Sequence, residues 1–241
     1  MPRYLNRAAL KAGARAAMAE SKVNPYITAL VLVLVSYLLN HLSMRLVNYD
    51  DIMGYLYAYA MGEELSQETL LYVYRRLTEP NLAGRLIDLM IGVVQLMLST
   101  GFTLFCLRAV RRLENSVGNL LDSFGMFFRI LGLTIVEGVF IMLWSLLLVV
   151  PGIVASYRYR QAYYLLLEHP EMDIMDCIRR SKELMYGRKM ELFVLDLSFL
   201  GWYLLTAVPF VSVYVLPYTE TTFANYYVPI SPPGPSVAEG L

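Results

Sequence analysis

Four long stretches of the chain contain no Asp, Glu, Lys or Arg. Each has between 19 and 23 residues and is rich in Leu, Val and Ile. A helix needs about 20 mostly apolar residues to cross the hydrocarbon core of a membrane, and it satisfies its own backbone hydrogen bonds there. The pattern therefore predicts membrane-spanning helices. The stretches cover residues 23–44, 89–107, 138–157 and 197–219.

Prolines and charged residues divide these stretches into six expected spans. Pro151 and Gly152 should separate the third span from the fourth, because proline removes a backbone donor and glycine permits a sharp turn. Pro209 should separate the fifth from the sixth in the same way. The sequence therefore predicts an all-α, polytopic membrane helix bundle. Its spans are expected at about 25–44, 86–107, 129–149, 152–168, 190–208 and 210–227.

The distribution of basic residues predicts which side of this bundle faces the cytoplasm. With six spans, fourteen Lys and Arg residues fall on one side, and an excess of these residues marks the cytoplasmic side. Both termini are therefore predicted to be cytoplasmic. If residues 152–168 did not span, the five basic residues of segment 179–189 would move outside, which favours six spans. The fourteen are Arg3, Arg7, Lys11, Arg15, Lys22, Arg108, Arg111, Arg112, Arg129, Arg179, Arg180, Lys182, Arg188 and Lys189.

The spans predict a single integral-membrane domain over residues 1–229. Residues 3–22 have the pattern of a weakly amphipathic basic helix, which is either an anchor on anionic lipid or a topology signal in helical form. Residues 1–22 have no apolar core, so we expect no cleaved signal peptide. The other segments expected outside the spans are a basic interfacial helix (1–23), an external loop (45–85), a cytoplasmic helix (169–189) and a disordered Pro-rich tail (230–241).

Two of these segments contain a further helical pattern. Residues 67–77 have an apolar side within the external loop, which suits interfacial packing or a binding surface. Pro170 suits a first helical position and Gly187 a C-terminal cap, so a helix is predicted over 170–187 along the cytoplasmic face of the bundle. Its mostly apolar stripe contains Ile174, Cys177, Ile178, Ser181 and Met185.

Composition agrees with a lipid environment. The chain is 57% hydrophobic and 17% charged, against about 45–50% and about 25% in soluble domains. Two cysteines exclude a disulfide scaffold, and both fall near the predicted cytoplasmic side, where thiols stay free. The formal net charge is zero. Topology explains the basic loops, so we expect no nucleic acid as a partner.

Signatures of catalysis are missing from the sequence. It has no His-Glu-x-x-His, no Gly-x-Ser-x-Gly, no P-loop and no Cys/His cluster. His41 and His169 fall near opposite membrane faces and cannot share one metal ion. We therefore expect no catalytic residues, no metal and no cofactor.

Five ionisable residues inside the predicted spans form the candidate polar cluster. A charged side chain inside a membrane is energetically costly, so each such residue is a candidate for a functional role. We expect Arg160 to pair with Glu220 or Glu137, and Arg158 to extend to the outer headgroups, because the two arginines lie about 200° apart around a helix. The cluster is either a set of structural ion pairs or a polar cavity for a substrate, proton or lipid headgroup. Its members are Glu137, Arg158, Arg160, Asp196 and Glu220.

Three segments of the C-terminal half resemble a known family. They read WSLLLVVPGIVASYRYRQAYYLLLEHP from Trp144, SKELMYGRKMELFVLDLSFLGW from Ser181 and, near the end, LPYTETTFANYY. This combination is similar to the bacterial integral-membrane family called domain of unknown function 975. The resemblance implies a multi-pass bacterial inner-membrane protein with no established activity. The chain differs from the family pattern at Arg158 and Arg160, where small or polar residues are usual.

The expected function is non-enzymatic. The sequence favours a multi-pass protein of the bacterial cytoplasmic membrane that acts in membrane or envelope homeostasis. Its expected partners are membrane lipids, through anionic headgroups at the cytoplasmic face, and other membrane proteins. A small transporter or permeation protein with a polar intramembrane site is the alternative. A third possibility is an intramembrane enzyme that uses two of the carboxylates as acid and base.

Overall fold

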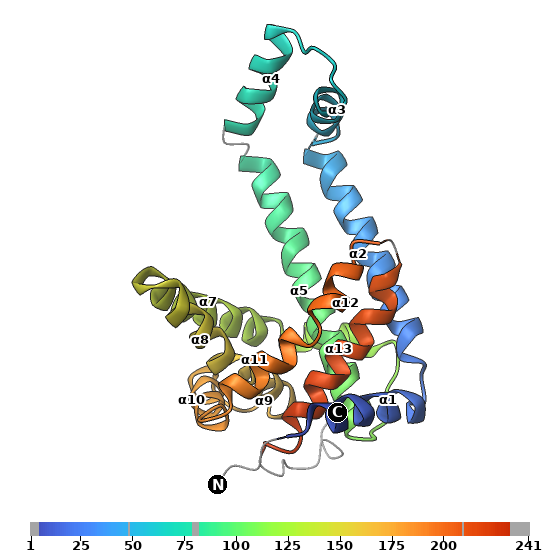
Figure 1. Ribbon diagram of the computed structural model, residues 1–241, viewed down its shortest axis with the longest axis vertical. Helices are drawn as coiled ribbons and strands as arrows, with labels where there is room; N and C mark the ends of the chain where they lie inside the picture. The colour runs from blue at the N-terminus through green and yellow to red at the C-terminus, as the bar shows by residue number, and fades with distance from the viewer. Residues whose placement is uncertain (1–4, 48, 79–81, 209, 232–241) are drawn as a thin grey trace. The chain divides into compact units, whose positions relative to one another are not determined.

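The computed structural model describes residues 5–47, 49–78, 82–208 and 210–231. Every regular element in these ranges is a helix, which confirms the predicted all-α class (Figure 1). Pro209 and residues 232–241 of the predicted tail lie outside the described residues. The helices are α1 (Arg7–Glu20), α2 (Pro25–Val47), α3 (Tyr49–Ala60), α4 (Gln67–Thr78), α5 (Leu82–Val110), α6 (Asn119–Asp122), the 3-10 helix η1 (Ser123–Met126), α7 (Phe127–Leu147), α8 (Val149–Tyr159), α9 (Ala162–Glu168), α10 (Ile174–Leu184), α11 (Lys189–Leu197), α12 (Leu200–Leu205) and α13 (Val211–Tyr227).

The chain forms two compact units. The larger contains Met1–Val33 and Met97–Leu241, and the smaller contains Leu34–Leu96. Both boundaries fall inside long helices, so α2 and α5 each contribute one part to each unit. The predicted candidate residues all belong to the larger unit.

Three helical segments among the described residues are long and apolar enough to cross a membrane. They are Pro25–Leu46, Leu82–Val110 and Asn119–Leu147. The second is one unbroken helix, whereas the third joins α6, η1 and α7. These segments contain the first three predicted spans almost completely.

The core of the larger unit lies where α5, α9 and α13 meet. Phe105 of α5 and Leu165 of α9 are fully buried. Tyr164 of α9 stacks on Tyr227 of α13, with ring centroids 5.0 Å apart. Because α9 is buried on nearly every side, its seven residues are held by packing rather than by helix length.

The N-terminal helix α1 packs against α13. Its buried face consists of Leu10, Ala14 and Met18. The basic helix predicted over 3–22 is confirmed over Arg7–Glu20. Asn225 of α13 donates to the Leu10 carbonyl at 2.9 Å. A Cβ atom at Gly13 would lie 2.5 Å from Asn225 Nδ2, so glycine permits this close approach.

The hairpin between α7 and α8 turns earlier than predicted. Leu148 is extended, with φ −165° and ψ 153°, and α8 already begins at Val149. Pro151 therefore lies in the first turn of α8, where its missing N–H interrupts no intrahelical bond. Gly152 instead serves close packing, because a Cβ there would lie 2.1 Å from Ser145 Oγ.

Two predicted spans are not continuous helices. The helix expected over 152–168 is interrupted at Arg160 and Gln161, between α8 and α9. The helix expected over 190–208 is interrupted at Ser198 and Phe199, between α11 and α12. Run length in the sequence could not show these breaks, because no proline or glycine marks either of them.

Helix α10 is shorter than the helix predicted over 170–187. The Asp173 side chain accepts a hydrogen bond from Met175 N at 3.1 Å, so α10 begins after Asp173 and not at Pro170. Gly187 has the positive φ of +74° that suits a residue just beyond a helix. α10 runs beside α7, because Ile174 contacts Gly132 and Lys182 lies 5.7 Å from the Phe140 ring centroid.

The smaller unit replaces most of the expected loop over 45–85 with helices. The predicted helix over 67–77 is confirmed as α4, whereas α3 was not predicted. Within this unit, Gln95 donates to Asn40 at 2.9 Å and Ser43 hydrogen-bonds Asp88, so the parts of α2 and α5 in it are joined by polar contacts. The rings of Tyr55 and Tyr72 meet edge to face.

Candidate functional site

The structure brings three of the five predicted ionisable residues together. Arg160 ends α8, Asp196 lies on α11 and Glu220 lies on α13. Arg158 lies on α8 but outside this cluster, and Glu137 lies apart on α7. The predicted cluster of five is therefore a cluster of three, which we call the Arg160 cluster.

Asp196 is the centre of the Arg160 cluster. Its Oδ2 atom lies 2.9 Å from Arg160 Nη1 and accepts a hydrogen bond from the Tyr157 hydroxyl at 2.8 Å. The Tyr203 hydroxyl donates to Oδ1 at 3.3 Å. The carboxylate thus accepts from a guanidinium and two phenols on α8 and α12, and charge-assisted bonds of this kind are stronger than neutral ones.

Aromatic rings cover the other side of Arg160. Its guanidinium carbon lies 4.1 Å from the ring centroid of Phe223 on α13. Phe223 in turn contacts Phe199, and Lys11 of α1 lies 4.1 Å above the Phe199 ring. Cations over aromatic faces are attracted by the ring quadrupole. The arginine is therefore held by a carboxylate on one side and by an aromatic ring on another.

Both helix interruptions lie beside this ion pair. Arg160 is itself the C-terminal cap of α8. On the other chain segment, the Ser198 hydroxyl bonds back to the Leu195 carbonyl, and Lys11 Nζ lies 3.2 Å from the Ser198 carbonyl oxygen. A cation is favourable at a helix C-terminus, where carbonyls lack partners. At the end of α11, polar side chains therefore bond to backbone carbonyls that the break leaves without intrahelical partners.

The predicted partner of Arg160 was wrong. We expected Glu220 or Glu137, whereas the direct partner is Asp196. Glu220 interacts with Arg160 electrostatically, and its carboxylate accepts a hydrogen bond from Thr103 of α5 at 3.3 Å. The reason is that α11 packs against α8, which brings Asp196 to Arg160.

Glu137 is a buried carboxylate outside the Arg160 cluster. It is only 7% exposed, and its Oε1 atom has no hydrogen-bond partner among the described residues. One turn earlier, Thr134 shares a hydrogen bond of 2.6 Å with the Tyr163 hydroxyl, and Tyr163 interacts electrostatically with Glu137. Glu137 thus faces α9 and not Arg160.

Arg158 lies at a contact between helices. Its carbonyl accepts a hydrogen bond from Ser181 of α10 at 2.9 Å, and its side chain is half-buried. We expected Arg158 to reach the outer headgroups and α10 to lie at the cytoplasmic face. Together these expectations place Arg158 far from α10. The structure places residue 158 directly against α10, so those two expectations are incompatible.

A second polar network, which the sequence did not predict, lies at the ends of three helices. Arg111 lies 2.7 Å from Glu168, whose other oxygen accepts from the Tyr227 hydroxyl at 2.9 Å. Arg111 also donates to Ser231 at 3.0 Å. This network ties together the ends of α5, α9 and α13. Glu168 and Arg111 lie at the ends of apolar stretches, where a charged residue is ordinary and does not indicate a site.

Helical spacing could have found one of the two tyrosines that bind Asp196. Tyr157 precedes Arg160 by three residues and therefore lies on the same side of α8. Tyr203 lies beyond the break at Ser198 and Phe199, so no helical spacing relates it to Asp196. Both hydroxyls donate to the Asp196 carboxylate.

In the described part of the chain, no group of three or more His, Cys, Asp or Glu residues is close enough to hold a metal ion. Cys106 and Cys177 are buried and free. Burial, together with Asp173 and Asp176, raises the pKa of Cys177 to about 11, so this thiol stays protonated at neutral pH.

The fold and the site define an all-α protein with three helices that are long and apolar enough to cross a membrane. Residues 146–232 match the family model described as "Protein of unknown function (DUF975)", which confirms the resemblance for this part of the chain. The match contains Arg160, Asp196 and Glu220, whereas Glu137 and α1 precede it. Comparisons with curated proteins and with solved structures gave no match.

Proposed function

We propose that this chain is a multi-pass protein of the bacterial cytoplasmic membrane that acts without catalysis. It acts in envelope homeostasis, through contacts with membrane lipids and with other membrane proteins. The observation that carries this proposal is the exposed apolar surface of the long helices. Leu38 of α2 is 63% exposed, Met90 of α5 is 70% exposed and Leu146 of α7 is 72% exposed.

This surface fits lipid better than water. At the tip of the α7–α8 hairpin, apolar residues are exposed without interruption from Leu146 to Val150. Soluble monomers rarely expose contiguous apolar patches of more than a few hundred Å². The polar side chains of the Arg160 cluster are instead turned toward one another. The outside of these helices is therefore suited to acyl chains.

The proposed topology has six spans and both termini in the cytoplasm. α2, α5 and α7 form three spans, and the broken helices α8–α9 and α11–α12 form two more, followed by α13. The fourteen basic residues counted in the sequence then fall on the cytoplasmic side. Internal breaks in spanning helices are tolerated where side chains satisfy the freed backbone groups, as Lys11 and Ser198 do here.

Cysteine labelling in intact cells tests this topology. Glu64, between α3 and α4, and Tyr186, beyond α10, are both exposed, so single cysteines there are accessible. We expect a membrane-impermeant maleimide to label Glu64→Cys in intact cells and Tyr186→Cys only after the membrane is opened. The wild-type chain, with both of its own cysteines buried, is the control. Labelling of Tyr186→Cys in intact cells would contradict a topology in which α7 and α8–α9 both span.

Lipid and protein contacts are tested on gently purified protein. We expect mass spectrometry to find phospholipids that remain bound after detergent extraction, and crosslinking in membranes to capture other membrane proteins. Turnover of any substrate by the purified protein, lost in Asp196→Asn but retained in Tyr186→Ser, would contradict a non-catalytic role.

A second function is favoured by a different observation. Both broken helices meet at Arg160 and Asp196, and in transporters substrate sites are typically formed where spanning helices are discontinuous. A small permeation protein would use the Arg160 cluster as its polar site. Protons are the simplest probe, because Asp196 and Glu220 can carry them.

Proteoliposomes with a pH-sensitive dye inside test this second function. An imposed pH gradient should decay faster with the wild-type protein than in empty vesicles, and Asp196→Asn should abolish the difference. Glu137→Gln is the matched control, because it changes a buried carboxyl outside the Arg160 cluster. Equal decay with wild-type protein and with empty vesicles would exclude proton permeation.

A further inference from the structure

We propose that a groove between α1 and the start of α2 binds the phosphate headgroup of an anionic phospholipid. This inference rests on the proposed membrane location and names the lipid class. The groove measures about 450 Å³, within the usual range of ligand sites. Two basic residues line it, Arg15 on α1 and Lys22 in the linker. Its other lining side chains include Met18, Ser21, Asn24 and Tyr26.

Among the described residues, no acidic residue pairs with a basic residue of α1. Arg7, Lys11 and Arg15 recur every four residues and therefore share one side of the helix, where like charges destabilise it. Burial and the two neighbouring arginines lower the pKa of Lys11. No ion pair joins Arg7 or Arg15 to an acidic residue in the described ranges, and Lys11 rests on the Phe199 ring.

Basic residues at the end of α5 show the opposite arrangement. Arg108 pairs with Asp122 at 3.4 Å, Arg111 pairs with Glu168 at 2.7 Å and Arg112 pairs with Glu20 at 3.2 Å. If basic residues served only as topology signals, we would expect no such difference between α1 and the end of α5. The contrast indicates that α1 keeps its charge for an anion outside the chain.

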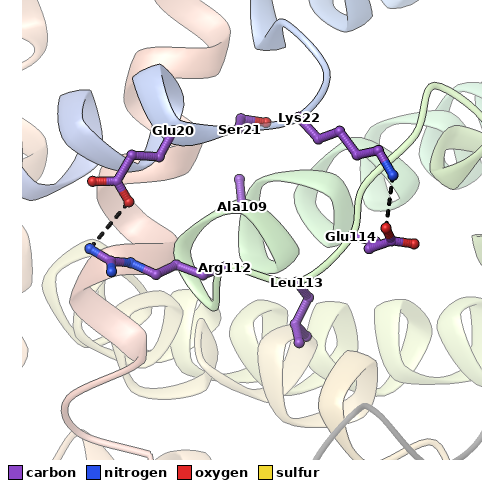
Figure 2. Close-up of a pocket in the computed structure, with 7 residues that line it drawn as sticks. All are labelled: Glu20, Ser21, Lys22, Ala109, Arg112, Leu113 and Glu114. Atoms are coloured by element: carbon purple, nitrogen blue, oxygen red, sulfur yellow. Dashed lines mark hydrogen bonds and ion pairs between the residues drawn. The ribbon is translucent and has the colours of Figure 1, made fainter.

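The chain beside the groove is tied to the end of α5. Figure 2 shows a pocket that shares Ser21 and Lys22 with the groove, where Glu20 pairs with Arg112 and Lys22 pairs with Glu114. Asn115 donates to the Ser21 hydroxyl at 2.7 Å. The last residue of α1 and the first two residues of the linker are thus each held by a contact, and the groove is present without a ligand.

The position of the groove favours a lipid over a free anion. Tyr26 lies in the first turn of α2, which is long and apolar enough to cross a membrane. The groove therefore opens at the boundary between headgroups and acyl chains, where tyrosine is favoured. A phosphate bound by Arg15 and Lys22 would place its glycerol and acyl chains beside Tyr26, at the start of the apolar helix α2.

Native mass spectrometry of the full chain in detergent micelles tests this site. Phosphatidylglycerol, phosphatidylcholine and inorganic phosphate are titrated separately. We expect wild-type protein to retain phosphatidylglycerol and to bind the other two far more weakly. Arg15→Gln with Lys22→Gln should weaken phosphatidylglycerol binding by about 30-fold, because a basic residue near a lipid surface contributes about 1 kcal/mol.

Two further variants make the test specific. Arg180→Gln with Lys189→Gln removes the same charge outside the groove and should leave binding unchanged. Glu114→Gln frees Lys22 from its carboxylate and should strengthen binding. Equal binding of phosphatidylglycerol by the wild type and the groove variant would overturn the site, as would equal affinity for inorganic phosphate or phosphatidylcholine. Cysteine labelling reports membrane insertion separately, so failure here leaves the proposed function standing.

Discussion

Asp196 and Glu137 are both carboxylates in apolar helices, yet their surroundings differ. Asp196 accepts hydrogen bonds from Arg160, Tyr157 and Tyr203. Glu137 is more deeply buried, and one of its oxygens has no partner in the described part of the chain. Removing a satisfied buried charge leaves its partners unpaired, whereas removing an unsatisfied group relieves a cost. Removal of the carboxylate should therefore lower the free energy of unfolding at Asp196 and raise it at Glu137.

The largest expected effect is that of Asp196→Ala. It should lower the free energy of unfolding by about 3 kcal/mol, because it leaves the Arg160 guanidinium without its carboxylate. Unfolding of the purified protein in mixed detergent micelles measures this. Asp196→Asn, which keeps the shape, should cost less. A loss below about 1 kcal/mol for Asp196→Ala would show that the ion pair is dispensable.

A double-mutant cycle isolates the ion pair itself. Arg160→Met should lower the unfolding free energy by about 2 kcal/mol, less than Asp196→Ala, because two tyrosine donors still reach Asp196. Combined with Asp196→Ala, the loss should fall short of the sum by about 1–2 kcal/mol. Additive losses would mean that Arg160 and Asp196 act independently.

Single hydroxyl groups test the tyrosine contacts. Tyr157→Phe removes a bond of 2.8 Å and should lower the unfolding free energy by about 1 kcal/mol. Tyr203→Phe removes a bond of 3.3 Å and should cost about half as much. The same unfolding assay compares the two variants. The reverse order would place the stronger donor on α12.

The smallest expected effect has the opposite sign. Glu137→Leu should raise the unfolding free energy by up to about 1 kcal/mol, because an apolar side chain of similar size replaces a buried carboxyl with an unpartnered oxygen. Glu168→Leu is the matched control and should destabilise, because Arg111 and Tyr227 lose their acceptor. Destabilisation by Glu137→Leu would reveal a partner of Glu137 that the described residues do not contain.

The sequence predicted much of the helical architecture. Runs without charge located α2, α5 and α7 to within a few residues, and the basic helix α1 and the external helix α4 were also expected. Helix caps were less accurate. Pro170 suggested a start for α10 that the Asp173 side chain moved to Ile174. α3 was missed because its residues carry no strong apolar period.

The candidate site was predicted in part. Charge within apolar runs selected Arg160, Asp196 and Glu220, which the fold brings together. It also selected Glu137 and Arg158, which the fold places outside this cluster. The pairing could not be predicted, because it depends on which helices pack side by side, and α11 lies against α8.

The amino-acid sequence alone determined the all-α class, the long apolar helices and the set of charges buried among them. These properties depend on local composition and on the length of uncharged runs, which any chain segment carries with it. Tertiary structure decided which carboxylate meets Arg160, which basic residues remain without partners, and where two helices break. Those outcomes depend on contacts between helices distant in sequence, such as Lys11 with Ser198, whose hydrogen bond no local pattern encodes.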